Sequence, residues 1–218
     1  MTRPVLVIAS GNTGKLAEFR QLLEEVLPHG AVDVRGRPAG VTVEETGADF
    51  LANACLKATT VARCTGAWTL ADDSGLCVDA LDGRPGIHSA RYAPGNARRM
   101  ERLLEELAGC RDRSARFVTA LALARPDGAV ALTSRGVSNG SILEAPIGEG
   151  GFGYDPLFWV PTVGLSFAQM TPAQKRRHGH RGRAFAGLQP RLVTLLRQQP
   201  DVFRAPEAPS PGSPPPGG

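Results

Sequence analysis

The chain has 218 residues, of which 42% are hydrophobic and 21% are charged. This composition is typical of a soluble globular protein, with enough residues for one domain or for two lobes around a cleft. No apolar run approaches the roughly 20 residues of a membrane-spanning helix, and the N-terminus begins with a strand-like run and lacks the regions of a signal peptide. We therefore expect a cytoplasmic protein.

The net charge of +4 and the pI near 9.2 suggest an acidic partner. The basic residues are scattered, however, except for one run at 175–183. Such a run can bind nucleic acid, act as a nuclear address or surround a phosphorylated ligand. Because no helix-turn-helix pattern, zinc spacing or aromatic platform accompanies it, nucleic-acid binding is the weaker interpretation.

The cysteines are widely spaced and form no Cys-x-x-Cys pair. This spacing favours buried reduced thiols over disulfides or a zinc site. The residues concerned are Cys55, Cys64, Cys77 and Cys110.

Strand and helix patterns alternate in the first half of the chain. The predicted strands are 4–9, 31–35, 41–45, 68–71 (which runs into Asp72) and 76–81. Apolar spacing predicts helices over 15–27, 48–64 and 96–108, and composition predicts turns at 10–14 and 82–86.

The second half begins with two long strands. These cover 117–124 and 130–138 and are joined by the hairpin signal Pro126-Asp127-Gly128. Short segments near 166–178 and a last helix over 182–198 follow. The order predicts an α/β fold in which a two-lobed mixed sheet is flanked by helices around a central cleft. We expect one domain over 1–204 and a disordered Pro/Gly-rich tail over 205–218.

A glycine-containing loop, Ser10-Gly11-Asn12-Thr13-Gly14-Lys15, lies between the first strand and the first helix. Glycines there allow backbone N–H groups to approach an anion, and the helix N-terminus adds positive potential. Lys15 is within reach of a bound phosphate. The loop lacks the glycine and hydroxyl spacing of a P-loop, so an ordinary strand-to-helix turn is the alternative.

Two adjacent carboxylates, Asp72 and Asp73, precede Ser74 and Gly75 at the predicted end of an apolar strand. Open α/β sheets place ligand sites at such strand ends. Neighbouring carboxylates repel each other unless a cation compensates them, and Mg²⁺ commonly uses one or two carboxylates together with phosphate oxygens. In the alternative interpretation one aspartate caps a turn and the other is solvated.

Two further segments have compositions that suit a binding site. Glu44-Glu45-Thr46-Gly47 offers a second acidic pair, which is either a metal-side group or an ordinary acidic helix start. Residues 150–156 combine glycines with Phe152, Tyr154 and Asp155. This composition suits a loop that stacks on a flat ring, or a tight turn with core aromatic residues.

The basic run ends in His180-Arg181-Gly182 and supplies hydrogen-bond donors. Donors of this type match the carbonyl edge of a purine but not the amino group of adenine. Lys57, in the second predicted helix, is another candidate phosphate partner, although a lone helical lysine is usually solvated.

Together and in this order, these segments resemble the inosine triphosphate pyrophosphatase family, the dITP/XTP pyrophosphatases. The matching segments are Ser-Gly-Asn-Thr-Gly-Lys at 10–15, Glu-Glu-Thr-Gly at 44–47, Asn-Ala-Cys-Leu-Lys-Ala at 53–58, Ala-Asp-Asp-Ser-Gly at 71–75, Pro-Gly-Ile-His-Ser-Ala-Arg-Tyr at 85–92, Gly-Gly-Phe-Gly-Tyr-Asp-Pro at 150–156 and His-Arg-Gly at 180–182. They span about 3 to 198, nearly the whole predicted domain.

The resemblance implies a homodimeric, two-lobed enzyme with a nucleotide-binding cleft. Such enzymes use Mg²⁺ to cut deaminated purine nucleoside triphosphates (ITP, dITP, XTP) into the monophosphate and pyrophosphate. By analogy Asp73 is the catalytic base and a metal ligand, Glu45 the second metal-side carboxylate, and Asp72 a supporting one. The residues implied to bind substrate are Ser10, Gly11, Asn12, Thr13, Gly14, Lys15, Lys57, Ser74, Phe152, Gly153, Tyr154, Asp155, Lys175, His180 and Arg181.

Within that family, the residue before His-Arg is usually serine, whereas this chain has Gly179. The connection between Tyr92 and Arg116 is also short. Two rival functions stay open: a pyrophosphatase for another modified nucleotide, including pyrimidines, and a non-catalytic nucleic-acid-binding protein that uses 175–183. No residue explains how GTP, which shares the 6-oxo group, would be rejected.

Overall fold

A computed structural model describes residues 3–27, 30, 32–199 and 202–203. Within this part of the chain, seven strands form one mixed sheet in the order β2-β1-β3-β4-β5-β6-β7. The predicted α/β class with a mixed sheet is confirmed. The predicted tail at 205–218 lies outside the described residues.

The first half of the chain builds the parallel part of the sheet. β1 (Val5–Ile8) pairs in parallel with β2 (Asp33–Gly36) and with the start of β3 (Trp68–Val78). The predicted strand at 41–45 is wrong, because this segment has no strand partner in the structure. Its alternating Val41 and Val43 instead pack against an apolar cluster at α2.

The second half adds an antiparallel extension. β3 pairs with β4 (Ser114–Ala124), β4 with β5 (Val130–Ile142), and two short strands, β6 (Phe158–Val160) and β7 (Leu165–Ser166), complete the sheet. The strands predicted at 68–71 and 76–81 are one continuous strand, which ends at Val78 and is followed by a 3₁₀ helix, Asp79–Leu81.

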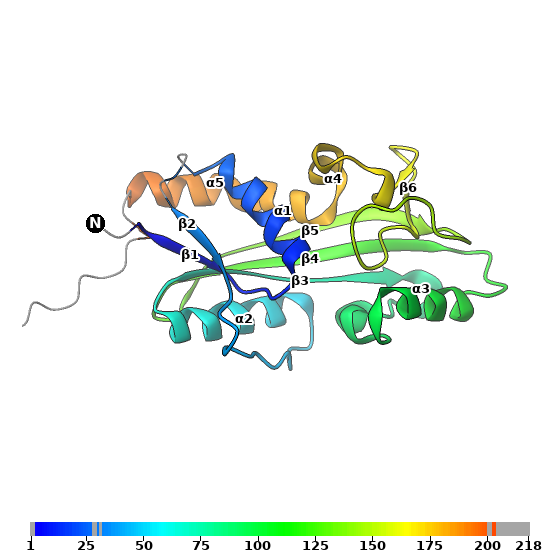
Figure 1. Ribbon diagram of the computed structural model, residues 1–218, viewed down its shortest axis with the longest axis horizontal. Coiled ribbons are helices and arrows are strands. Elements are labelled where there is room, and N and C mark those ends of the chain that lie inside the picture. The colour runs from blue at the N-terminus through cyan, green and yellow to red at the C-terminus, as the bar shows by residue number, and fades with distance from the viewer. Residues whose placement is uncertain (1–2, 28–29, 31, 200–201, 204–218) are drawn as a thin grey trace, which may run out of the picture.

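Helices cover both sides of this sheet (Figure 1). The first side carries α1 (Thr13–Glu24), α4 (Pro172–His178) and α5 (His180–Gln198), and the second carries α2 (Phe50–Thr65) and α3 (Gly95–Glu106). Another 3₁₀ helix, η2 (Gly86–Arg91), packs against β3 and a third, η3 (Phe167–Gln169), precedes α4.

Local signals explain where α2 begins and ends. The Asp49 side chain accepts a hydrogen bond from the backbone N–H of Ala52 and caps the N-terminus, and Gly66 ends the helix with a φ of 63°. The inner face of the helix is rich in alanine, as is the sheet opposite. Because these side chains are small, the α2 backbone lies close to the sheet, and the amine of Lys57 reaches β3.

The cysteines are less buried than predicted. Cys77 is buried, but Cys55 and Cys110 are partly exposed and Cys64 is exposed, so the prediction of four buried thiols is wrong. All four cysteines are free.

Among the described residues, none of the helices is both long and apolar enough to cross a membrane.

Candidate active site

A polar gap separates two apolar clusters on the α1/α5 face of the sheet. Along β3, Leu70 belongs to the cluster under α1 and α5, and Leu76 belongs to the cluster beside α3. Between them Asp72 and Ser74 point to the same face, because alternate residues of a strand share a face. Thr119 of β4 pairs with Ser74 and extends the gap to the next strand. The gap therefore places polar side chains where the two clusters separate.

One edge of β3 is open at this gap. β1 pairs with β3 only as far as Leu70, whereas β4 pairs with it along 69–78. Lys15 at the start of α1 and Glu45 in the segment before α2 both reach side chains at this edge. The aspartate pair was predicted at a strand end, and it lies instead within β3, directly after the end of the parallel neighbour.

The two aspartates point to opposite faces of the sheet. Asp72 accepts hydrogen bonds from Lys15 Nζ (2.8 Å) and Ser74 Oγ (2.6 Å) on the α1/α5 side, and Arg181 Nε lies 3.6 Å from it. Asp73 accepts from Lys57 Nζ (2.9 Å) and Asn53 Nδ2 (3.2 Å) on the α2 side. Strand alternation therefore divides the acidic pair between two clusters.

Burial and charge act in opposite directions on Asp72 and Lys15. Burial alone would raise the pKa of Asp72, but the positive charges of Lys15 and Arg181 lower it far below its ordinary value. Burial also lowers the pKa of Lys15, and Asp72 only partly opposes this shift. Asp72 is therefore ionised and anchors Lys15.

A second cation, Lys57, is held between two carboxylates. Its Nζ donates to Glu45 Oε1 at 2.6 Å and to Asp73 Oδ1 at 2.9 Å. Arg91 NH1 lies 3.1 Å from the other oxygen of Glu45. Burial is the main cause that raises the pKa of Asp73, and Lys57 opposes it. A buried carboxylate with a raised pKa is a stronger base than an exposed one.

The segment that was predicted to bind phosphate forms the turn between β1 and the start of α1. Asn12 caps the helix by accepting from the backbone N–H of Lys15 at 3.1 Å, and Ser10 Oγ accepts from the N–H of Asn12 at 3.2 Å. A Cβ on Gly14 would lie 2.8 Å from the Phe152 ring. Glycine at this position therefore lets the aromatic loop approach the start of the helix.

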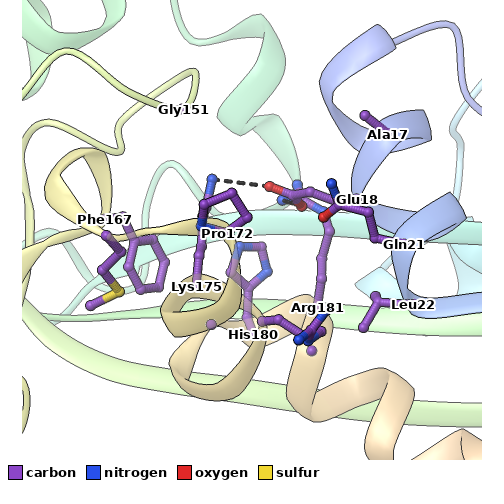
Figure 2. A pocket seen from close by; sticks show the side chains of 14 residues that line it. Ala17, Glu18, Gln21, Leu22, Gly151, Phe167, Pro172, Lys175, His180 and Arg181 are labelled. Atoms are coloured by element: carbon purple, nitrogen blue, oxygen red, sulfur yellow. Dashed lines mark hydrogen bonds and ion pairs between the residues drawn. The ribbon is translucent and has the colours of Figure 1, made fainter. Parts of the chain in front are cut away.

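A pocket of about 210 Å³ lies between α1 and the turn that joins α4 to α5, and Gly151, Phe167 and Met170 complete its lining. Figure 2 shows Glu18 and Lys175 facing each other across it. Glu18 Oε1 lies 3.0 Å from Lys175 Nζ, and its Oε2 lies 2.9 Å from Arg181 NH1. The pocket is smaller than the roughly 300–1,000 Å³ typical of drug-sized ligands, so its size suits one part of a nucleotide.

Phe152 supplies a flat surface near the cations of this pocket. Lys175 Nζ lies 4.9 Å and the Arg181 guanidinium 5.1 Å from the centre of its ring. Asp155 accepts from Lys175 at 2.7 Å and from the backbone N–H of Phe152 at 2.8 Å. These contacts fix the position of the loop relative to α4 and α5.

His180 begins α5 and is buried at the wall of the pocket. Its ring stacks on Phe117, with centroids 4.7 Å apart, and lies near Phe167. Nδ1 is hydrogen-bonded to Thr119 Oγ1, which is also 2.8 Å from Ser74 Oγ. Burial is the main cause that lowers the pKa of His180 well below its ordinary value, and the charge of Arg181 adds to it. The imidazole is therefore neutral.

Three predicted site residues lie elsewhere than expected. Tyr154 is buried in the cluster beside α3 and donates to the backbone carbonyl of Ser89 at 3.0 Å, so its assignment to the pocket is wrong. Lys175 was predicted to bind the triphosphate, but it lies beside Phe152, which was predicted to line the nucleotide pocket. It does not lie with Lys15 and Lys57. Asp72 does not join Asp73 and Glu45, because it points to the opposite face of β3.

The basic run is divided between the site and the surface. Lys175, His180 and Arg181 are directed into the site. Arg176, Arg177 and Arg183 are exposed, although Arg176 pairs with Glu25 at 2.8 Å and Arg183 donates to a backbone carbonyl of β5. Only part of the charge that suggested nucleic-acid binding is therefore used inside the molecule.

All three lysines of the chain lie in the site. Lys15, Lys57 and Lys175 have side chains that are 17%, 11% and 14% exposed, whereas the many other cations are arginines. A lysine ammonium is a compact charge whose pKa shifts readily on burial. The positions of the three lysines in the sequence thus indicate the site, and the prediction from the motifs did not use them.

Four further residues of the site were not predicted from the motifs: Glu18, Asn53, Arg91 and Thr119. Glu18 follows Lys15 by three residues and Asn53 precedes Lys57 by four, so helical spacing places each pair on one face. Arg91 was part of a matching segment without an assigned role. Thr119 had no local signal, because only strand pairing brings it beside Ser74.

No group of three or more histidine, cysteine, aspartate or glutamate side chains converges in the described part of the chain in a way that could hold a metal ion. Two carboxylate oxygens, from Glu45 and Asp73, do meet at one point, where Lys57 Nζ now provides the positive charge. Mg²⁺ commonly takes one or two carboxylates and completes its shell with phosphate oxygens and waters. This donor pair therefore fits Mg²⁺ when a triphosphate is present.

Comparisons with known proteins agree on one family. Residues 6–191 match the Ham1 family. A dITP/XTP pyrophosphatase from Synechococcus sp. (strain CC9311) is 56% identical over 200 residues, which cover 92% of this chain and 95% of that protein.

Two solved structures are also similar to this chain. A HAM1 protein from Coxiella burnetii has a TM-score of 0.76 and 38% identity, covering 89% of this chain and 99% of that one. A nucleoside-triphosphatase or dITP/XTP pyrophosphatase from Mycobacterium abscessus has a TM-score of 0.65 and 39% identity, covering 84% and 97%. The resemblance carried by the sequence motifs is confirmed, and this chain belongs to the Ham1 family.

Proposed function

We propose that this protein is a nucleoside triphosphate pyrophosphatase that hydrolyses ITP, dITP and XTP with Mg²⁺, releasing the monophosphate and pyrophosphate. The observation that supports this most strongly is the pair of lysine–carboxylate clusters at the open edge of β3. Relatives named dITP/XTP pyrophosphatases share half or more of their residues with this chain. The enzyme would remove deaminated purines from the nucleotide pool.

Glu45 and Asp73 are the residues that would hold Mg²⁺. A bound Mg²⁺ offsets charge on the triphosphate and favours deprotonation of a nearby water. Asp73 itself would accept the proton of the attacking water at a carboxylate oxygen, because this buried carboxylate lies beside the metal position. Asn53 donates to the other oxygen and keeps the carboxylate oriented.

The lysines on both faces of β3 bind the phosphates. Lys15 and Lys57 lie on either side of the strand, so they offset the negative charge that builds on the departing pyrophosphate. The N–H groups at the start of α1 add donors at the same end of the site. Asp72 serves this cluster as the anchor of Lys15.

The base binds on the side of Phe152, Lys175 and Arg181. The aromatic ring provides a stacking surface and the two cations provide donors for oxygen atoms of a 6-oxopurine. Adenine presents an amino donor at the same position and cannot accept from these groups, which would then keep only their bonds to Glu18 and Asp155.

A substrate panel tests the assignment. We expect hydrolysis of dITP and XTP with Mg²⁺ to exceed that of dGTP and dATP at equal concentration, with pyrophosphate as the product. A modified pyrimidine triphosphate that is turned over more than about tenfold faster than dITP would refute the purine assignment. Homodimer assembly stays a prediction from the resemblance, and cytoplasmic location stays a prediction from the sequence.

A further inference from the structure

A chain of hydrogen bonds links Asp72 to His180 across two strands and a helix. Ser74 Oγ donates to Asp72 Oδ2 at 2.6 Å, Ser74 and Thr119 hydroxyls are 2.8 Å apart, and Thr119 Oγ1 contacts His180 Nδ1. Thr119 and His180 are both buried. None of the proposed steps at the phosphates needs this chain of contacts.

The number of protons fixes the direction of every bond in this chain. Asp72 is bound to Lys15 as a carboxylate and can only accept, so the single proton of Ser74 goes to Asp72. Thr119 must then use its own proton for Ser74 Oγ. Thr119 Oγ1 can then only accept a hydrogen bond from the histidine. His180 Nδ1 therefore carries a proton and donates a hydrogen bond to Thr119 Oγ1.

We propose that Thr119 is a positioning residue that fixes His180 in its Nδ1–H tautomer, so that a bare Nε2 acceptor faces the base of the substrate. His180 lines the pocket, and its Nε2 has no hydrogen-bond partner among the described residues. Figure 2 shows the ring between Lys175 and Arg181. The neutral state of the buried imidazole agrees with a single N–H.

In this arrangement His180 would accept from the base, whereas the sequence motifs suggested that it donates. Arg181 and Lys175 supply donors to the pocket and both also bind the Glu18 carboxylate, whereas His180 Nε2 is an acceptor without a partner among the described residues. A 6-oxopurine presents the complementary pair, since its oxo group accepts and its neighbouring N1–H donates. Adenine presents the reverse pair, and so it would face donors with a donor and an acceptor with an acceptor. The specificity part of this inference rests on the proposed function.

Nitrogen NMR of the ¹⁵N-labelled protein measures the tautomer directly. We expect long-range proton–nitrogen spectra to show His180 protonated at Nδ1 and bare at Nε2, with its signals assigned by their loss in His180→Gln. Thr119→Val, which keeps the shape of the side chain and removes the hydroxyl, should abolish this preference. Ser74→Ala should move the proton to Nε2, because Thr119 is then free to donate to Nδ1.

Two variants control for effects on the fold. Thr119→Ser keeps the hydroxyl and should keep the Nδ1–H tautomer. Thr69→Val makes the same change at another buried threonine of the sheet, whose hydroxyl donates to the Ala67 carbonyl, and should also leave the tautomer unchanged. A wild-type protein protonated at Nε2, or an unchanged tautomer in Thr119→Val, would overturn the proposal.

Kinetics test the consequence for specificity. Thr119→Val should lower the dITP over dATP ratio of kcat/KM by about tenfold, the effect of about one hydrogen bond, mainly through the KM for dITP. Thr119→Ser should restore it. A changed tautomer with an unchanged ratio would overturn the role of Nε2 in reading the base. If the wild-type enzyme turns over no dITP, the proposed function fails while the tautomer result stands.

Discussion

Asp72 and Asp73 are neighbours in the chain, but their carboxylates lie on opposite faces of β3. Asp72 pairs with Lys15 at 2.8 Å and Asp73 with Lys57 at 2.9 Å. The same two residues that suggested one metal site thus organise two sets of groups. Asp73 lies with Lys57 and Glu45 in one set, and Asp72 lies with Lys15 and Ser74 in the other.

The two aspartates should therefore respond differently to the same substitution. Asp73→Asn should lower turnover by about 10²–10⁴-fold, because it removes the proposed catalytic base. Asp72→Asn should destabilise the protein by about 3 kcal/mol, since it leaves Lys15 and Arg181 without their shared buried anion. Turnover and urea denaturation measure these effects, with Asp79→Asn, at an exposed carboxylate after β3, as the control. Equal effects of the two site variants on both quantities would contradict the division.

Because of Glu18, the free energy of unfolding should depend on pH in the acidic range. Burial raises its pKa, but Arg181 and Lys175 together lower it below its ordinary value. A carboxylate whose pKa is lowered by folding stabilises the protein at pH values above the unfolded pKa, and this stability is lost as pH falls through the folded pKa. Glu18→Gln should thus cost about 1.5 kcal/mol at pH 7 and progressively less below the ordinary glutamate range.

Urea unfolding from pH 7 to pH 3 measures this difference. Glu24→Gln changes an exposed glutamate of the same helix and should behave like the wild type at every pH. A Glu18→Gln deficit that stays constant as the pH falls would show that packing, and not charge, explains the effect.

Acetylation of lysine should inactivate the enzyme. The chain has only three lysines, and all of them line the site. Lys15 has the most exposed side chain of the three, at 17%, so a reagent should reach it first. Peptide mass spectrometry during treatment with an acetylating reagent should show modification of Lys15 in step with the loss of activity. Pyrophosphate should protect it, and full modification without loss of activity would contradict the assignment.

Restoring the family serine at position 179 should impair the enzyme. A Cβ there would lie 2.4 Å from the backbone carbonyl of Lys175. Serine gains only a few tenths of a kcal/mol as a helix cap over glycine, whereas overpacking costs about 1–3 kcal/mol. Gly179→Ser should lower the melting temperature and raise KM by about threefold, because Lys175 moves.

Gly40→Ser provides the matched change, since a Cβ at Gly40 meets no atom within 4 Å. An unchanged melting temperature in both variants would show that the turn between α4 and α5 accommodates serine.

The sequence was sufficient for the class of fold, and most of the predicted site residues lie close together in the structure. Residues placed by local structure, such as Asn12 and Lys15 at the start of α1, lie where the motifs predicted them. Errors arose where partners are distant in the chain. The end of the strand was placed at Ala71, and so the alternation that separates Asp72 from Asp73 was not applied to them.

Other errors have a similar cause. Tyr154 lies in a glycine-rich loop whose composition suits either a stacking platform or a packed turn, and only the position of Ser89 decides that it is packed. Thr119 becomes part of the site through pairing with Ser74, which no spacing along the chain shows. Val41 and Val43 alternate like a strand because they are half-buried, although no neighbouring strand pairs with them.

The most direct test of the proposed chemistry is hydrolysis of dITP with Mg²⁺ in H₂¹⁸O, by the wild type and by Asp73→Asn. We predict that the wild type releases pyrophosphate and dIMP, that the ¹⁸O appears in dIMP because water attacks the α phosphorus, and that Asp73→Asn loses this activity while it keeps its fold. Release of orthophosphate with dIDP, or undiminished turnover by Asp73→Asn, would contradict the proposed role of Asp73.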